Sequence, residues 1–539
     1  MREKFLTVIV SVVLALTLPL QLFAGQLDDY YLAAFALQAA PLNITALQKS
    51  LLLPAAEPGD MPHCGTPLKK SLRRDWNLLE QTTQKVLTKQ LAKPVLSGEQ
   101  TYLSPTGKFR IHYTMTGSDA VPSLDWVKTV AQTFDDVAAS YTSLQWQPAP
   151  TSGDASYDVY LRNLAPAGYY GVTNSDQAAS TASYPNAYTS WMELDNNFTD
   201  SLYKPATYSP LQSLQVTAAH EYHHAIQFGY NYYFDTWYAE ATSTWMEDEL
   251  YDSVNQLYSY IPAWFTKSKL SLDIPDSTST GGGYGRWIFN RYLSEKHGSA
   301  TALTVWENLA AISSPNGSDI SMTPVLDGVL TSTYSASLGN DFFGFAKRVY
   351  TRDWTTHRAD TADIHPYSPV ATYSTYPVNS TTVSSPPSVN LPHYSFAYYK
   401  FTPSGSVSPD LFISVSGTDG ISAAVFKKSA GIITEVLPDT NGKLFTITGF
   451  SGLNPTADEV VLLIVNTTSL DNQTASFSLE ISTIPGDCDS DSAVSITEVQ
   501  NAISMFLGIE SVGGCVDSDN SNNVSIAEVQ KVINRFLRL

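Results

Sequence analysis

The feature that most constrains this chain is a helical segment with closely spaced histidines. The sequence His-Glu-Tyr-His-His, which begins at His220, lies in a pattern that predicts a helix from about Leu214 to Phe228, ended by Gly229. Residues four apart share one helix face, so His220 and His224 can bind a single metal ion. Glu221 projects beside them and can act as a base without being a ligand. The fold must therefore bring further ligands to this helix.

A third ligand is expected on the next helix, predicted from Trp237 to about Leu250. Glu240 lies in its first turn, and Glu247 lies two turns further on, about 10 Å away. Both carboxylates cannot bind one ion, and we predict that Glu240 is the ligand. His223 points away from the ligand face and is expected to pack against its surroundings or to support the site. Alternatively, the histidines line a wet surface patch and Glu240 is an ordinary exposed carboxylate.

These two helices resemble those of the gluzincin peptidases. The strings A-H-E-x-x-H-A-I-Q-F-G-Y and W-Y-A-E-A-T-S-T-W-M-E-D are similar to those of a family of secreted bacterial metalloproteases first noted in myxobacteria, and the similarity runs from about Cys64 to Gly298. The resemblance implies an α+β zincin-like catalytic domain with zinc-dependent endopeptidase activity. It also implies one catalytic zinc ion and Glu221 as general base, with the ligands His220, His224 and Glu240.

Two more residues are candidates for roles at such a site. Tyr284, in Gly-Gly-Gly-Tyr-Gly, is either a loop donor that steadies an oxyanion or an ordinary loop tyrosine. Cys64, in Pro-His-Cys-Gly-Thr-Pro, offers a thiolate that would fill the fourth position on zinc. Its segment resembles the cysteine-switch propeptide motif of matrix metalloproteases, with His63 where that motif has Arg, and the resemblance implies latency. An inert or disulfide-linked cysteine is the alternative.

The N-terminus predicts an exported precursor. A short basic region precedes an apolar run from Phe5 to Phe23, so residues 1–25 are expected to be a signal peptide, with a membrane anchor as the alternative. Residues 26–95 are the expected propeptide and residues 96–375 the expected catalytic domain. The formal net charge of −20 disfavours nucleic-acid binding. We expect a secreted protein without a membrane segment after signal removal, and attachment to the cell surface stays open.

The second half of the chain predicts further domains, because 539 residues are too many for one compact core. A stretch rich in Pro, Ser and Thr over residues 376–393 is the expected linker. Short alternating strands separated by Gly, Asn and Asp predict a β-sandwich over residues 394–484. We find no catalytic cluster in this range, so an accessory role is expected.

Residues 485–539 contain a duplicated loop, and an apolar helix follows each copy. Both copies match a twelve-residue calcium loop, and Ser492 and Asn522 take the place of the usual glycine at its sixth position. The expected ligands of two structural calcium ions are Asp487, Asp489, Asp491, Ala493, Ser495 and Glu498, then Asp517, Asp519, Ser521, Asn523, Ser525 and Glu528. Cys488 and Cys515 are expected to be able to pair in an oxidising compartment.

The loop–helix pairs resemble type I dockerin domains, which implies attachment to a cohesin-like module. A calcium-stabilised tail without a partner is the alternative. For the whole chain we predict a secreted zinc metalloendopeptidase with protein or peptide substrates. Two alternatives stay open: a non-enzymatic extracellular scaffold with a structural metal site, and a zinc hydrolase acting on glycans or other amides. Glu221 favours an enzyme, because a structural site has no use for a carboxylate beside its ligands.

Overall fold

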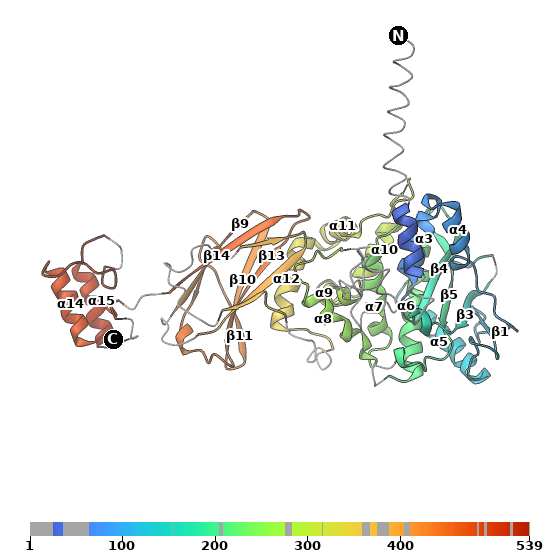
Figure 1. The fold of residues 1–539 in the computed structure, drawn as a ribbon, viewed down its shortest axis with the longest axis horizontal. Coiled ribbons are helices and arrows are strands. Elements are labelled where there is room, and N and C mark those ends of the chain that lie inside the picture. Colours follow the sequence, from blue (N-terminus) through green and yellow to red (C-terminus); the bar gives the residue numbers. More distant parts are fainter. Residues whose placement is uncertain are drawn as a thin grey trace, which may run out of the picture. The chain divides into compact units, whose positions relative to one another are not determined.

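The computed structural model describes residues 25–35, 64–153, 155–203, 208–274, 283–314, 316–357, 367–373, 388–403, 410–481, 485–489, 493–517 and 521–537. The predicted signal peptide lies outside these residues except for Gly25. Two compact units divide the chain (Figure 1): Met1–Trp264, Asp273–Ser337 and Trp354–His365 in the first, and Phe265–Leu272, Leu338–Asp353 and Pro366–Leu539 in the second. Several sheets and many helices make this a multidomain α+β protein. Within the described ranges, no helix is long and apolar enough to cross a membrane.

The first unit is built on a five-stranded sheet in the order β1-β2-β3-β5-β4. Its strands are β1 (Gln100–Leu103), β2 (Phe109–Tyr113), β3 (Tyr157–Arg162), β4 (Gly171–Ala178) and β5 (Tyr188–Asp195). The strands β2, β3 and β5 are parallel, whereas β1 and β4 are antiparallel edge strands. The helices α5 (Leu124–Ser143) and α6 (Pro210–Tyr230) pack against this sheet. The edge strand β4 therefore lies next to the helix that carries the paired histidines.

The helix α6 begins at a capping box. The Ser209 side chain accepts a hydrogen bond from the Gln212 backbone N–H, and the Gln212 side chain accepts one from the Ser209 backbone N–H. The prediction that Gly229 ends the helix is wrong, because α6 continues to Tyr230. A Cβ at Gly229 would lie 2.8 Å from Cδ of Pro150, so this glycine permits a close approach between the helix and a loop.

The helix α7 (Thr236–Leu250) packs against α6 and against α9 (Trp287–His297). A buried ion pair between Asp248 and Arg291 joins α7 to α9. The helices α10 (Thr301–Ala310) and α11 (Met322–Tyr334) pack against each other, and α10 also contacts α6 and α9. The helix α6 thus contacts both α7 and α10 in addition to the sheet.

The N-terminal segment, residues 25–95, is mostly helical where it is described, as the sequence predicts. It contains a helix over 25–35, α3 (Thr66–Asp75) and α4 (Gln81–Leu87). A small apolar core joins these helices through Tyr31, Phe35, Leu72, Leu79 and Leu87. The helix α3 also packs against β4.

The second unit contains two sheets that share one apolar core, in agreement with the predicted β-sandwich. One sheet has the order β11-β10-β13-β8-β6, with β11 (Ile432–Val436), β10 (Ile421–Ser429), β13 (Glu459–Asn466), β8 (Ser395–Phe401) and β6 (Ala371–Tyr373). The other has the order β12-β9-β14-β7, with β12 (Leu444–Ile447), β9 (Leu411–Gly417), β14 (Gln473–Ile481) and β7 (Ser388–Leu391). The helix α12 (Leu338–Thr351) packs against β13.

The borders of the sandwich differ from those expected. The strand β7 lies inside the predicted linker, and β6 and α12 lie inside the predicted catalytic range. Both strands are short, so their sequences carry little alternation, and their pairing with β14 and β8 decides their conformation.

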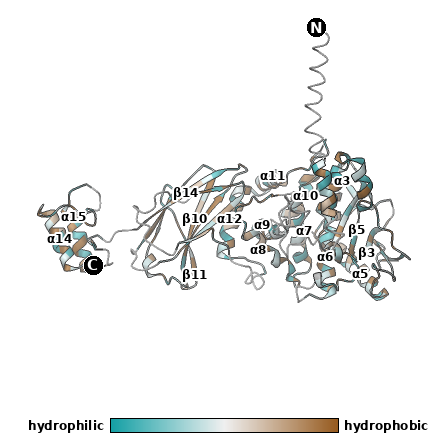
Figure 2. Cartoon of the chain, in the orientation of Figure 1, coloured by the Kyte–Doolittle hydropathy of each residue, from teal (hydrophilic) through white to brown (hydrophobic). Residues whose placement is uncertain are grey.

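The C-terminal repeat folds into two helices, α14 (Ile496–Phe506) and α15 (Ile526–Phe536), which pack together. Apolar positions on both helices are brown in Figure 2. A small core includes Val499, Ala502, Val529 and Val532. Cys488 and Cys515 form a disulfide, which confirms the predicted pairing and leaves Cys64 as a buried free cysteine.

Candidate metal centre

Side chains from α6, α7 and the N-terminal segment meet at one buried point. Nε2 of His220 and Nε2 of His224 are 3.0 Å apart. The Glu240 carboxylate lies 3.2 Å from the first nitrogen and 3.1 Å from the second. Sγ of Cys64 completes the group, since one ligand atom from each of these four residues lies within 4.8 Å of the others. The structure thus brings together the three predicted zinc ligands and the predicted latency cysteine, here called the candidate metal centre.

The Nδ1 atoms of His220 and His224 each have a hydrogen-bond partner. His220 Nδ1 lies 2.7 Å from Oε1 of Glu247, and His224 Nδ1 lies 2.8 Å from Oε1 of Gln227. Such partners fix the tautomer of an imidazole and aim its Nε2 at a metal. Glu247 therefore lies at the Nδ1 side of His220, whereas Glu240 lies at the Nε2 side. The role of Gln227, one turn after His224, was not predicted from the sequence.

His223 faces away from the centre, as expected from its place on the helix. Its ring stacks on Tyr141, with ring centroids 5.4 Å apart, and its Nδ1 lies 3.0 Å from Oγ of Ser243. Burial and the neighbouring His224 and His220 lower the pKa of His223 well below its usual range. It is therefore a neutral packing residue of the helix pair.

Glu221 lies beside the candidate metal centre at the edge of the sheet. Its Oε2 accepts hydrogen bonds from Oγ1 of Thr173 on β4, at 2.7 Å, and from Oγ1 of Thr66, at 3.2 Å. A Cβ at Gly171 would lie 2.6 Å from Cγ of Glu221, so glycine is needed for α6 to approach β4 this closely. The sequence offered no local signal for these contacts, because they join residues far apart in the chain.

Tyr284 also reaches the centre. It begins the short 3-10 helix η7 (Tyr284–Arg286), and its side chain is buried. Its hydroxyl accepts a hydrogen bond from the Cys64 backbone N–H at 2.9 Å, and its ring centroid lies 6.0 Å from that of His220. A small pocket opens here, and its lining residues are Cys64, His220, Glu221, Glu247 and Tyr284 together with Tyr170, Val216, Thr217, Gln256 and Tyr260.

The N-terminal segment reaches the centre along the edge of β4. Cys64 forms an isolated parallel bridge with Gly171, and the Gly65 N–H donates to the Gly171 carbonyl at 3.1 Å. The Thr173 N–H donates to Oγ1 of Thr66 at 2.7 Å. A Cβ at Gly65 would lie 2.6 Å from Cγ2 of Val172, so glycine is required for this close pairing.

In comparisons with known proteins, no family model and no curated protein matches this chain.

The electrostatics of the centre suit a cation. Burial works against ionisation of Glu240, but His224 and His220 outweigh it and lower the pKa of its carboxyl to about 2. Burial, with Glu221 and Glu240, raises the pKa of the Cys64 thiol well above its usual range. Oε2 of Glu240 is buried and lies 3.2 Å from Nε2 of His220. Two imidazoles, a carboxylate and a thiol are the donors that zinc prefers, so the residues fit this ion.

The first predicted calcium loop brings three of its acidic residues together. Ligand atoms of Asp487, Asp489 and Glu498 lie within 4.8 Å of one another. Ser495 and Glu498 also form a capping box at the start of α14. Asp491, like Ser492 at the sixth position, lies outside the described residues, whereas Ala493 is described.

The second loop turns around Asp517. Its carboxylate accepts from the backbone N–H groups of Ser521, at 3.0 Å, and Asn522, at 2.8 Å. Asn522 has a φ of 58°, the left-handed conformation that the sixth position of such a loop requires. Among the other expected ligands, the Asn523 carbonyl accepts a hydrogen bond from Oγ of Ser521. Ser525 and Glu528 form the capping box of α15. Asp519 lies outside the described residues.

Proposed function

We propose that this chain is a zinc-dependent metalloendopeptidase with a zincin-like catalytic domain, exported as a latent precursor. The observation that carries the proposal is the convergence of His220, His224 and Glu240 beside Glu221 at the edge of a sheet. When bound, zinc would supply Lewis-acid chemistry, which polarises a substrate carbonyl and increases the acidity of water. A structural zinc site would have no use for a buried carboxylate next to its ligands.

The residues of the centre have separable roles in hydrolysis. Glu221 takes a proton from the attacking water and passes it to the leaving amine, and Thr173 already holds its carboxylate in place. Glu247 and Gln227 orient the two imidazoles. Once the Cys64 N–H no longer bonds to it, the Tyr284 hydroxyl would donate a hydrogen bond to the substrate oxygen that becomes negative.

A polypeptide substrate is supported by the contacts of the edge strand β4. This strand forms a backbone bridge with Cys64 at Gly171, and the Gly171 carbonyl accepts a hydrogen bond from the Gly65 N–H just before α3 begins. Backbone pairing of this kind recognises a peptide and has no counterpart in a glycan. We infer that a protein or peptide occupies the same edge during turnover.

Latency follows from what the N-terminal segment contacts. Cys64 supplies a fourth donor at the centre, Thr66 donates to Glu221, and the Cys64 N–H donates to Tyr284. The segment therefore engages the metal ligands, the base and the oxyanion donor together. A substrate can enter only after this stretch leaves.

The C-terminal module is proposed to hold two calcium ions and to act as a dockerin-like attachment domain for a cohesin-like module. Exposed apolar side chains at equivalent positions of its two helices support a protein partner: Ile496 and Ile526, Phe506 and Phe536, and Leu507 and Leu537. The Cys488–Cys515 disulfide supports an oxidising, extracellular location.

The test compares the full chain carrying Cys64→Ser with the same chain that also carries Glu221→Gln. Casein cleavage and zinc content are measured in parallel, with exposed Glu307→Gln as the matched control in the same background. Cleavage that is lost only with Glu221→Gln, at unchanged zinc content, supports the proposal. Equal zinc content with no cleavage in any of the three proteins refutes the peptidase and favours a structural metal site.

A further inference from the structure

The helix α3 presents one face to the body of the first unit. Thr66, Lys70 and Arg74 are spaced by four and therefore lie along one side of this helix. Thr66 bonds to Glu221, while Arg74 lies 2.7 Å from Oδ2 of Asp319. Lys70, between them, is 2% exposed. Such burial is rare for a lysine and requires groups that pair with its charge.

The surroundings of the Lys70 ammonium form a cage. Nζ lies 2.6 Å from Oδ1 of Asp319 and donates to the Phe234 carbonyl at 2.9 Å. It also lies 4.7 Å from the ring centroid of Phe234 and 5.3 Å from that of Tyr232. A carboxylate, a carbonyl and two aromatic rings are the groups that bind a desolvated ammonium.

Backbone pairing holds the cage residues in place without help from Lys70. Phe234 forms a parallel bridge with Ile320, and the Asp235 N–H donates to the Ile320 carbonyl at 3.2 Å. The Ile320 N–H donates in turn to the Tyr233 carbonyl at 3.3 Å. The cage therefore belongs to the body of the unit, and the lysine comes to it from the N-terminal segment.

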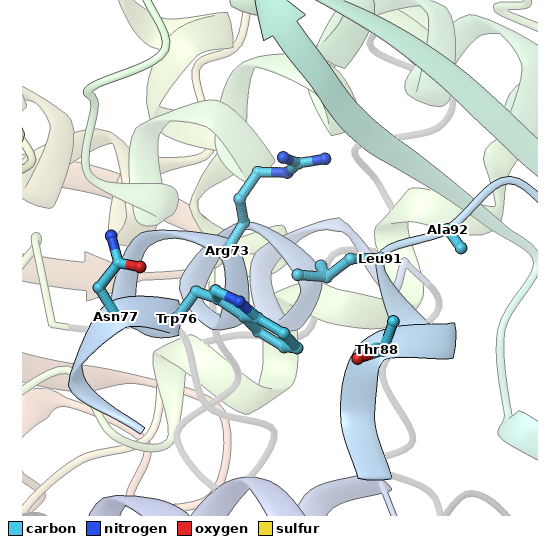
Figure 3. Close-up of a pocket in the computed structure, with 6 residues that line it drawn as sticks. All are labelled: Arg73, Trp76, Asn77, Thr88, Leu91 and Ala92. Atoms are coloured by element: carbon cyan, nitrogen blue, oxygen red, sulfur yellow. The ribbon is translucent and has the colours of Figure 1, made fainter. Parts of the chain in front are cut away.

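Arg74 shares Asp319 with Lys70, whereas the two other basic residues of α3, Lys69 and Arg73, have their contacts elsewhere. Lys69 bonds to Oε1 of Gln90, within the N-terminal segment itself. Arg73 lines a hollow of the same segment (Figure 3), together with Trp76, Asn77, Thr88, Leu91 and Ala92. In each of the pairs Lys69-Lys70 and Arg73-Arg74, the first residue contacts the N-terminal segment and the second contacts the body of the unit. Lys69 is therefore a matched control for Lys70.

We propose that Tyr232, Phe234 and Asp319 form a binding site for a primary ammonium group, and that Lys70 occupies it as a second anchor of the N-terminal segment, separate from Cys64. That this anchor helps to keep the peptidase inactive rests on the proposed function, whereas the ammonium-binding site does not. The segment is then held at two places, so loss of the thiol contact alone releases it part of the time and loss of both contacts releases it fully.

The free thiol of Cys64 reports release of the segment. It is 3% exposed and the other two cysteines are paired, so a disulfide reagent such as 5,5′-dithiobis(2-nitrobenzoate) must wait for the segment to open. In the full chain at matched zinc content, Lys70→Met should speed labelling on the order of tenfold to a hundredfold, from the loss of a charge-assisted bond. Asp319→Asn should also speed labelling, and Lys69→Met should stay within about twofold of wild type. Labelling of Lys70→Met at the wild-type rate overturns the anchor.

Chemical rescue tests the ammonium site itself. In Lys70→Ala, n-butylammonium should refill the cage and slow the labelling severalfold, whereas sodium chloride at equal ionic strength should not. A misfolded variant would not respond in this way, and a folded variant that ignores n-butylammonium overturns the site. Labelling of Cys64 does not depend on catalysis. A chain that cleaves no substrate would therefore refute the peptidase, and the labelling rates would still test the ammonium site.

Discussion

Glu247 offers a sharp test of the candidate metal centre, because its carboxylate bonds to the ring nitrogen of His220 that does not face Glu240. Its Oε1 lies 2.7 Å from Nδ1 of His220, and the two residues are 6% and 5% exposed. Water therefore cannot readily replace the bond. If His220 binds zinc through Nε2, a change at Glu247 should weaken zinc binding without removing a ligand.

The size of the effect depends on what replaces the carboxylate. Glu247→Gln keeps the volume and an acceptor oxygen but loses the charge, so the zinc Kd should rise about tenfold, which equals about 1.4 kcal/mol. Glu247→Ala leaves the buried Nδ1–H of His220 without its acceptor. The cost of an unsatisfied buried donor is about 1–3 kcal/mol, so the Kd should rise up to about a hundredfold.

The assay is competition for zinc between the full chain and a fluorescent chelator at fixed pH. The control is Glu307→Gln, an exposed glutamate on α10, whose Kd should stay within about twofold of wild type. Far-UV circular dichroism checks that each variant is folded. A folded Glu247→Ala protein with the wild-type zinc Kd would refute the assignment of His220 as a ligand oriented by Glu247.

Three further changes probe other parts of the molecule. Burial opposes protonation of His112, but the carboxylates of Asp158 and Glu99 outweigh burial and raise the pKa of His112 above 6.5. The protonated imidazole therefore stabilises the fold fully below pH 6.5, and this stabilisation is lost as the pH rises through the pKa of the folded state. His112→Gln should therefore lower Tm more below pH 6.5 than at alkaline pH, as thermal denaturation at several pH values can check. Gly171→Ala would place a Cβ 2.6 Å from Cγ of Glu221, so the free energy of unfolding measured in urea should fall by about 1–3 kcal/mol. Glu498→Gln or Glu528→Gln should each reduce bound calcium from about two ions to about one in titration calorimetry.

The core of the candidate site could be predicted because its signals are local. The spacing of His220 and His224 places both on one helix face whatever surrounds the helix, and Glu240 follows at the start of the next helix. The disulfide between Cys488 and Cys515 followed from the small number of cysteines and their place in one module. Each of these inferences needed only residues that lie close together in the sequence.

The remaining contacts depend on long-range packing. Nothing near Thr173 indicates that its hydroxyl meets Glu221, and nothing near Lys70 indicates a cage made by residues far along the chain. The error at Gly229 has the same origin, because a glycine within a helix ends it or permits a close approach depending on what packs there. The strand β7 was missed because four residues carry too little alternation.

The way the chain passes repeatedly between its two units limits how such a protein can be rearranged in evolution. The helix α12 covers β13, whose residues from Val460 to Val465 are 0% exposed, yet α12 precedes the expected linker in the sequence. A recombination event at that linker would separate the sandwich from its own helix and leave apolar surface prone to aggregation. We therefore expect the first unit and the sandwich to be inherited together, whereas the contiguous C-terminal repeat can be gained or lost in a single exchange.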